Sequence, residues 1–233
     1  MVAAETVAQP LVIAPTGKTP KDVNPALPAN ADIYIGTLKV PYYLAQKTDA
    51  TLANPTPTLN TYWKADATKP ALSEKFLGKV PCGAYATAAT LPDGQTATPS
   101  ASTTICFPSP VKQSDQTIPV LVTVPKTAKP AGGWPVVVFQ HGITRNRSDM
   151  LAVAPALAQA GFVTIAIDLP LHGVSADTAN PTNPMNLLYK NQAFSGTPAA
   201  ALVTGERTFD VDFINNSTGA AGPDGTAPRQ DAA

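Results

Sequence analysis

The sequence predicts an α/β fold, and three neighbouring segments carry that prediction. Val136–Phe139 is a β-branched apolar run that is too short for a buried helix and suits a buried strand. Residues 148–160 are rich in alanine and leucine, follow a helical pattern and end at Gly161. Residues 162–167 form a second apolar run, which leads to Asp168. A strand, a helix and a second strand fit within about 30 residues, which is the usual length of a unit in which a helical crossover joins two parallel strands.

The N-terminal part is expected to be an irregular, β-rich accessory region over residues 1–100. Residues 1–30 alternate apolar pieces with prolines, which predicts an extended arm. Residues 33–40 alternate like a strand that ends at Pro41. An aromatic group follows and either lines a lipid- or substrate-binding surface or forms the core of a small subdomain. Its members are Tyr42, Tyr43, Tyr62 and Trp63.

Two cysteines, Cys82 and Cys106, flank a loop rich in alanine, threonine, glycine and proline. A disulfide closing about 25 residues would stabilise the fold by roughly 3 to 4 kcal/mol and would indicate a periplasmic or extracellular location. The alternative is a pair of unpaired buried thiols. A zinc site is not expected, because the cysteines and the two histidines lack the close spacing of zinc ligands.

The sheet of the predicted core begins after residue 100, with strands at 104–107 and 117–124. In the crossover helix, Ser148 is the expected N-cap. Pro155 predicts either a kink or a helix whose regular part starts near Ala154, because proline cannot donate a backbone hydrogen bond.

The core is expected to span residues 101–218 and to contain a lid-like insertion over about 174–205. That insertion carries several prolines and only one modest apolar cluster, at 185–189, and long loops inside domains are often active-site lids. The last residues, 219–233, lack any aliphatic side chain larger than alanine and are expected to be a disordered tail.

Composition narrows the functional classes. Sixteen basic residues balance sixteen acidic ones, and 14% of residues are charged, which argues against a nucleic-acid-binding surface. The 25 prolines favour irregular and extended structure. No run of 18 apolar residues occurs, so no membrane-spanning helix is expected. Residues 1–10 lack the basic start and apolar core of a signal peptide.

The turn after the first apolar run allows two interpretations. A dinucleotide site would need a glycine-rich turn there, and the chain has no GxGxxG motif. The turn instead reads Gln-His-Gly-Ile, with His141, Gly142 and Ile143. A hydrolase of the α/β type uses such a turn to present a backbone N–H to the oxyanion of an ester's tetrahedral intermediate.

Together with three other stretches, this turn resembles the N-terminal half of bacterial extracellular lipases over roughly residues 30–222. Those lipases are large α/β-hydrolases that are secreted or surface-anchored, mostly in marine and virulence-associated Gram-negative bacteria. The stretches are 36–44, 62–64, 140–143 and 166–173.

The resemblance implies a partial, N-terminal half of an α/β-hydrolase-type sheet, acting without a cofactor on an acyl ester or lipid. It implies a secreted, outer-membrane-surface or periplasmic location. It also implies that Ile143 donates its N–H to the oxyanion, that Gly142 lets the turn approach the substrate and that His141 braces the turn.

The serine-nucleophile chemistry is missing from these residues. No GxSxG elbow occurs, and neither Ser175 nor Ser195 has the pair of flanking glycines that this motif needs. His141 and His172 precede any place for a triad histidine and are interpreted as turn residues. Asp168 is expected to accept hydrogen bonds from turn N–H groups rather than to contact a ligand. Arg145 and Arg147 are expected to be solvated, the alternative being a contact to a substrate carboxylate.

The chain is therefore interpreted as the N-terminal part of a secreted lipase or carboxylesterase, inactive alone because its nucleophile is missing. Its last strand would leave an open edge and an uncovered apolar face, which favour self-association. The alternative is a non-catalytic module that binds lipid or a partner through the aromatic group. A third possibility is a complete small hydrolase that uses Ser175 or Ser195.

Overall fold

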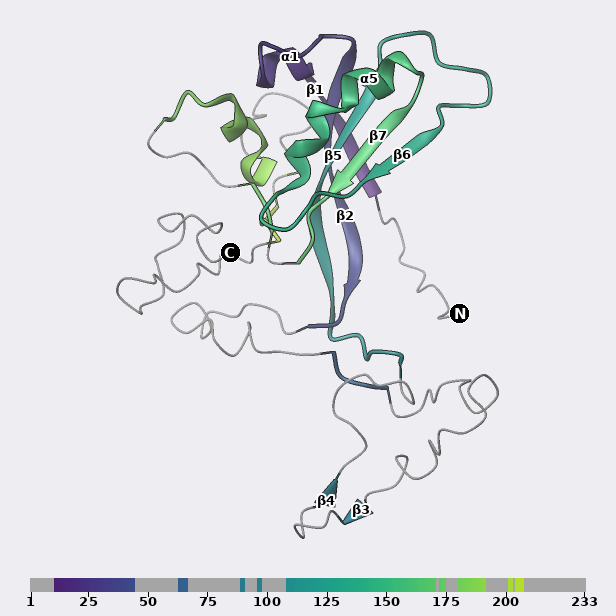
Figure 1. Cartoon of the computed structure of the whole chain (residues 1–233), viewed down its shortest axis with the longest axis vertical. Coiled ribbons are helices and arrows are strands. Elements are labelled where there is room, and N and C mark those ends of the chain that lie inside the picture. The colour runs from purple at the N-terminus through teal and green to yellow at the C-terminus, as the bar shows by residue number, and fades with distance from the viewer. Residues whose placement is uncertain are drawn as a thin grey trace. The chain divides into compact units, whose positions relative to one another are not determined.

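The computed structural model describes residues 11–44, 63–66, 89–90, 96–97, 108–170, 172–174, 180–191, 201–202 and 204–207. A mixed five-stranded sheet with few helices dominates them, in the strand order β1-β2-β5-β7-β6 (Figure 1). This is an α/β class of fold, as predicted. Its strands are β1 (Leu11–Lys18), β2 (Ala31–Tyr42), β5 (Ser114–Pro125), β6 (Val136–Phe139) and β7 (Val163–Ile167).

Four short helical elements and a second sheet complete the described structure. The α-helices are α1 (Pro20–Val23) and α5 (Ala154–Gln159), and the 3-10 helices are η2 (Arg147–Ala152) and η3 (Pro184–Asn191). Strands β3 (Ala89–Thr90) and β4 (Thr96–Ala97) form an antiparallel pair. None of the helices in the described ranges is long and apolar enough to cross a membrane.

The chain divides into two compact units. One comprises residues 1–6, 41–46 and 56–115, and the other comprises 7–40, 47–55 and 116–233. The first contains an isolated antiparallel bridge between Ala65 and Pro110 and a 2.8 Å hydrogen bond from the N–H of Gln113 to the carbonyl of Tyr42. The second contains the sheet, apart from the last two residues of β2 and the first two of β5.

The N-terminal arm differs from the expectation, because its residues 11–18 are a hydrogen-bonded strand. β1 pairs antiparallel with β2, with Leu11 opposite Leu38. Pro15 is accommodated because β1 lies at the sheet edge and its register shifts between Pro15 and Lys18. β2 also continues through Pro41, where the sequence predicted its end, and ends at Tyr42.

The strand predicted at 117–124 is confirmed as part of β5. Its apolar side chains Ile118, Val120, Leu121 and Val122 are all buried. β5 is antiparallel to β7, with Val120 opposite Ile167. The strand predicted at 104–107 and the boundary near residue 100 lie outside the described residues.

The predicted crossover is confirmed, since β6 and β7 are parallel with Val136 opposite Val163. Between them, η2 and α5 pack on β7. The regular helix starts at Ala154 with Pro155 in its first turn, where proline is tolerated. The N-cap is Asn146 rather than Ser148, because the Asn146 side chain accepts the N–H of Ser148 at 3.0 Å. Gly161, at φ +83°, ends the helix.

β6 is not the buried strand that its sequence predicted. It lies at the edge of the described sheet, and its side chains Val136 and Val138 are 60% and 77% exposed. Phe139, pointing to the other face, packs against the core. The described sheet thus has its edges at β1 and β6, and β7, the last of the described strands along the sequence, is not an edge.

The buried core joins residues that lie far apart in the sequence. Ile33 and Ile35 of β2 join Leu121 of β5 and Met150 of η2 in one buried cluster. η3, inside the expected lid-like insertion, contributes Leu188, which is 1% exposed. Apolar side chains from the described part of the insertion, Leu188 among them, thus pack against the core of the sheet.

Candidate active site

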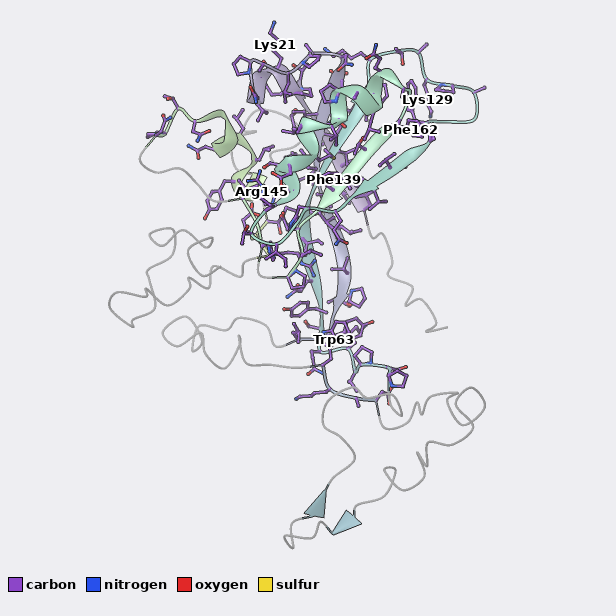
Figure 2. The ribbon with its side chains drawn as sticks, viewed as in Figure 1. Lys21, Trp63, Lys129, Phe139, Arg145 and Phe162 are labelled. Atoms are coloured by element: carbon purple, nitrogen blue, oxygen red, sulfur yellow. The ribbon has the colours of Figure 1, made fainter. Side chains whose placement is uncertain are left out.

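Two turns meet at one end of the parallel pair, because parallel strands finish at the same edge of a sheet. The turn after β6 carries His141 to Asn146, and the turn after β7 carries Asp168 to Gly173. Figure 2 shows Phe139, at this end of β6, well separated from Phe162, which precedes the opposite end of β7. The rings of His141 and His172 lie 4.9 Å apart between their centroids.

His141 links the first turn to the second. The side chain is 3% exposed, and its Nε2 accepts the N–H of Leu169 at 3.0 Å. Its Nδ1 lies 2.7 Å from the carbonyl oxygen of Gly142. Because Nε2 is an acceptor, the ring proton is assigned to Nδ1, which donates to that carbonyl.

His172 makes the reverse link. Its Nε2 accepts the N–H of Thr144 at 3.2 Å, and its Nδ1 lies 2.9 Å from the carbonyl oxygen of Pro170. Each histidine thus uses both ring nitrogens on backbone groups. A general base needs a free acceptor nitrogen, so this bonding supports the interpretation of both as turn residues.

Between the two histidine links, the first turn protrudes. Ile143 is 83% exposed, and a Cβ at Gly142 would meet nothing within 4 Å. Thr144 adopts φ +65°, the left-handed region that a β-branched residue rarely occupies. Its bond to His172 and a 3.2 Å bond from Arg145 N–H to the Gly142 carbonyl hold that conformation.

The backbone N–H of Ile143 is left available by this turn. Among the described residues, none accepts a hydrogen bond from it, whereas the N–H groups on its C-terminal side, those of Thr144 and Arg145, are both bonded. On a braced, strained turn whose Ile143 is 83% exposed, this N–H is a candidate donor to a ligand oxygen. Nothing in the sequence signals the left-handed Thr144, because threonine is not a residue favoured there.

The carboxylate of Asp168 is engaged by Arg147. This carboxylate is fully buried and accepts the backbone N–H of Arg147 at 2.6 Å and the Nη1 of Arg147 at 2.5 Å. The His141 Nε2 lies 3.9 Å from it, too far for a hydrogen bond. The carboxylate thus has the structural role that the sequence predicted, but it accepts one backbone N–H, that of Arg147, and pairs with the guanidinium of the same residue.

Arg147 corrects the expectation of a solvated residue, because it is 1% exposed. Its guanidinium contacts Glu206 through two bonds of 2.5 and 2.9 Å and donates to the carbonyl of Leu188 at 2.6 Å. Burial alone would lower the pKa of Arg147, but the charges of Glu206 and Asp168 outweigh burial and raise that pKa above its ordinary value. Arg147 is therefore a permanent buried cation.

Arg145 behaves as expected, since its side chain is exposed and pairs with Asp149 at 2.6 Å. Figure 2 shows it at the outside of the ribbon. The hydrogen bond and then the charge of Asp149 raise the pKa of Arg145. The two arginines lie two residues apart, and only the tertiary contacts separate a solvated one from a buried one.

Glu206 and Arg207 are the residues that sequence reasoning missed. Glu206 is 3% exposed and also accepts the N–H of Val174 at 3.1 Å. Arg207 donates to the carbonyl of Asp168 at 2.6 Å. Their only sequence signal is a charged pair in a segment that carries few charges.

The remaining predicted residues divide in two groups. In the first compact unit, Tyr42 is buried, Tyr43 is partly buried and Trp63 is 51% exposed. Within the described ranges, no cluster of His, Cys, Asp and Glu could hold a metal ion. The others lie outside the described residues: Tyr62, Cys82, Cys106, Ser175 and Ser195.

No family model, curated protein or solved structure matches this chain. Its function is therefore inferred from the geometry of the two turns.

Proposed function

We propose that this chain is the N-terminal part of a secreted or surface-located lipase or carboxylesterase, with the turn at His141, Gly142 and Ile143 as part of its oxyanion hole. The nucleophilic serine, its acid and its histidine base come from outside this chain. The proposed location is the bacterial exterior, outer-membrane surface or periplasm. The observation that carries the proposal is the N–H of Ile143, which has no acceptor among the described residues and lies on an exposed turn held by two histidines.

The fold supports this assignment. The turn follows a strand of a mixed sheet, β6, and leads into a helical crossover to a parallel neighbour. In α/β-hydrolases, one oxyanion donor comes from a loop that follows such a strand, and the other is the N–H after the serine. The strained Thr144 also fits a functional turn, where such strain is common.

In the proposed reaction, the serine hydroxyl attacks the ester carbonyl, and the base takes its proton. The carbonyl oxygen becomes negatively charged, and the N–H of Ile143 donates to it. The alcohol leaves with the proton, and water then releases the acid by the same steps. Gly142, without a side chain, leaves room for the substrate, while His141 and His172 keep the turn from moving when charge develops.

The proposal is tested by hydrolysis of p-nitrophenyl butyrate and octanoate, alongside fluorophosphonate labelling read by intact mass. The 233-residue chain and the full product of its gene are compared. We expect no turnover and no adduct for the chain, and turnover with one adduct for the full product.

Ile143→Pro in the full product removes the N–H donor, whereas Ile143→Ala keeps it. Because the Ile143 side chain is 83% exposed, the alanine variant is the matched control. We expect the proline variant to lose about 10²- to 10³-fold in kcat, the cost of one oxyanion donor, and the alanine variant to stay within about twofold.

Other outcomes would redirect the assignment. An adduct on Ser175 or Ser195 of the 233-residue chain would make it a complete, atypical hydrolase. A full product without turnover would contradict hydrolase activity. Binding to anionic lipid vesicles in that case would favour the alternative, a non-catalytic lipid-binding module, for which the 51% exposure of Trp63 is the supporting observation.

A further inference from the structure

We infer that Arg147 is a positioning residue of the oxyanion turn. We also infer that Glu206, which bonds both Arg147 and the N–H of Val174, fixes the two ends of the segment from Val174 to Glu206 at this arginine. This inference rests on the proposed function, because it concerns how the Ile143 N–H is held in place. It assigns a role to a buried charge cluster that has no part in the chemistry itself.

Arg147 closes the turn on the side opposite His141. The backbone N–H of Arg147 donates to one carboxylate oxygen of Asp168, and its guanidinium donates to the other. His141 accepts the N–H of the next residue, Leu169. Ile143 therefore lies between two links that both end at the carboxyl end of β7. A shift of either link would move its N–H relative to a substrate oxygen.

The guanidinium of Arg147 is paired with two carboxylates, Asp168 and Glu206, which explains how its charge can be buried. Arg147 and Arg207 bring two positive charges, and Asp168 and Glu206 bring two negative ones, all four residues being at most 8% exposed. Buried charges persist only when paired and hydrogen-bonded. Removing one partner leaves an uncompensated charge inside, so the surrounding links must rearrange.

Glu206 extends the cluster to a distant part of the chain. One carboxylate oxygen accepts both the Arg147 Nη1 and the N–H of Val174. Val174 follows the second turn by one residue, and Glu206 lies 59 residues beyond Arg147. The start and the end of this segment are thus fixed to the residue that closes the oxyanion turn.

The test uses Glu206→Gln, which keeps the side-chain shape and an acceptor oxygen but removes the charge, together with Arg147→Lys, which keeps the charge but not the forked geometry. Arg145→Lys is the matched control in the same turn, since the Arg145 side chain is exposed and pairs with Asp149, and the substitution keeps the backbone bond to the Gly142 carbonyl. Ile35→Val, in the core of β2, controls for general loss of stability.

Two readouts are compared. In the full gene product, we expect Glu206→Gln to lower kcat on p-nitrophenyl butyrate by about 10- to 100-fold, the cost of misplacing a donor, with KM within about twofold. In the 233-residue chain, amide hydrogen exchange over residues 141–147 and 168–174 should become at least about tenfold faster, with other regions unchanged. Arg145→Lys should change neither.

If Arg147→Lys does not fold, Glu206→Gln still decides the question. Exchange in the two turns that stays at the wild-type rate, or that rises evenly over the molecule as in Ile35→Val, would overturn the inference. If the full product shows no esterase activity, the proposed function fails, while local exchange still reports whether the cluster holds the turn.

Discussion

Gly36 shows how one residue can decide a strand pairing. It lies opposite Ile13 in the antiparallel pair of β1 and β2. A Cβ placed on it would overlap the carbonyl oxygen of Val12 and lie 2.7 Å from the Cγ2 of Ile13. Only glycine therefore allows β1 to approach β2 this closely.

We expect Gly36→Ala to lower the free energy of unfolding by about 2 to 3 kcal/mol, because the methyl group must push the β1 backbone away. Urea unfolding of the 233-residue chain measures this loss. A variant as stable as the wild type would contradict the close approach of the two strands.

Gly142→Ala is the complementary change, because a Cβ there would meet no atom within 4 Å. We expect its stability to stay within about 0.5 kcal/mol of the wild type. In the full gene product, the added methyl group should lower kcat/KM by about tenfold or more if the turn faces the substrate. Unchanged kinetics in a stable variant would count against Gly142 at the substrate.

At the scale of elements, α1 is a single helical turn whose start is fixed by hydrogen bonds between Thr19, the residue before it, and Asp22. The N–H and the hydroxyl of Thr19 both donate to Asp22 Oδ2, each at 2.7 Å. The hydroxyl bond and then the backbone bond keep the pKa of Asp22 below its ordinary value of 3.8. Val23, buried at the end of the turn, joins the core cluster, so the cap fixes how β1 connects to β2.

We expect Thr19→Ala to cost about 0.5 to 1 kcal/mol, the usual worth of an N-cap. The pKa of Asp22 is lower in the folded protein than its ordinary value of 3.8, so its negative charge stabilises the fold above pH 3.8. This stabilisation is lost as the pH falls from 3.8 through the lower, folded pKa. The stability difference between wild type and Asp22→Asn should therefore shrink on acidification below pH 3.8. Urea titrations at pH 7, 5, 4 and 3 measure it.

At the scale of the whole molecule, the sheet has an edge that the described residues leave open. This edge is β6, whose Val138 is 77% exposed, while β1 forms the other edge of the sheet. Unpaired backbone groups beside exposed valines favour pairing with another chain. The proposed missing half of the hydrolase would occupy this edge in the full gene product.

We expect the 233-residue chain to associate as its concentration rises, and Val138→Lys to weaken this, because a lysine on an edge strand opposes pairing. Val153→Lys is the control, since Val153 is also exposed, at 40%, but lies between η2 and α5. Sedimentation velocity at a series of concentrations distinguishes the variants. A wild-type chain that stays monomeric, or equal effects of both lysines, would contradict a role for the β6 edge.

Local rules determined the crossover from the sequence by itself. The β-branched run predicted β6 at its observed bounds, Val136–Phe139. Pro155 predicted either a kink or a helix starting near Ala154, of which the second is observed, and Gly161 marked the helix end. These features depend on backbone geometry and on neighbouring residues, which the sequence contains directly. The His-Gly-Ile turn was also identified this way, although its role stays a prediction.

Only the tertiary structure decided which residues are buried and what they meet. β6 reads as a buried strand, yet it is an edge because β7 lies between it and β5. Arg147 reads as a surface residue, yet it is buried because Glu206 reaches it from 59 residues away. A long-range partner or a neighbouring strand leaves no periodic signal in the local sequence, so these contacts appear only once the chain is folded.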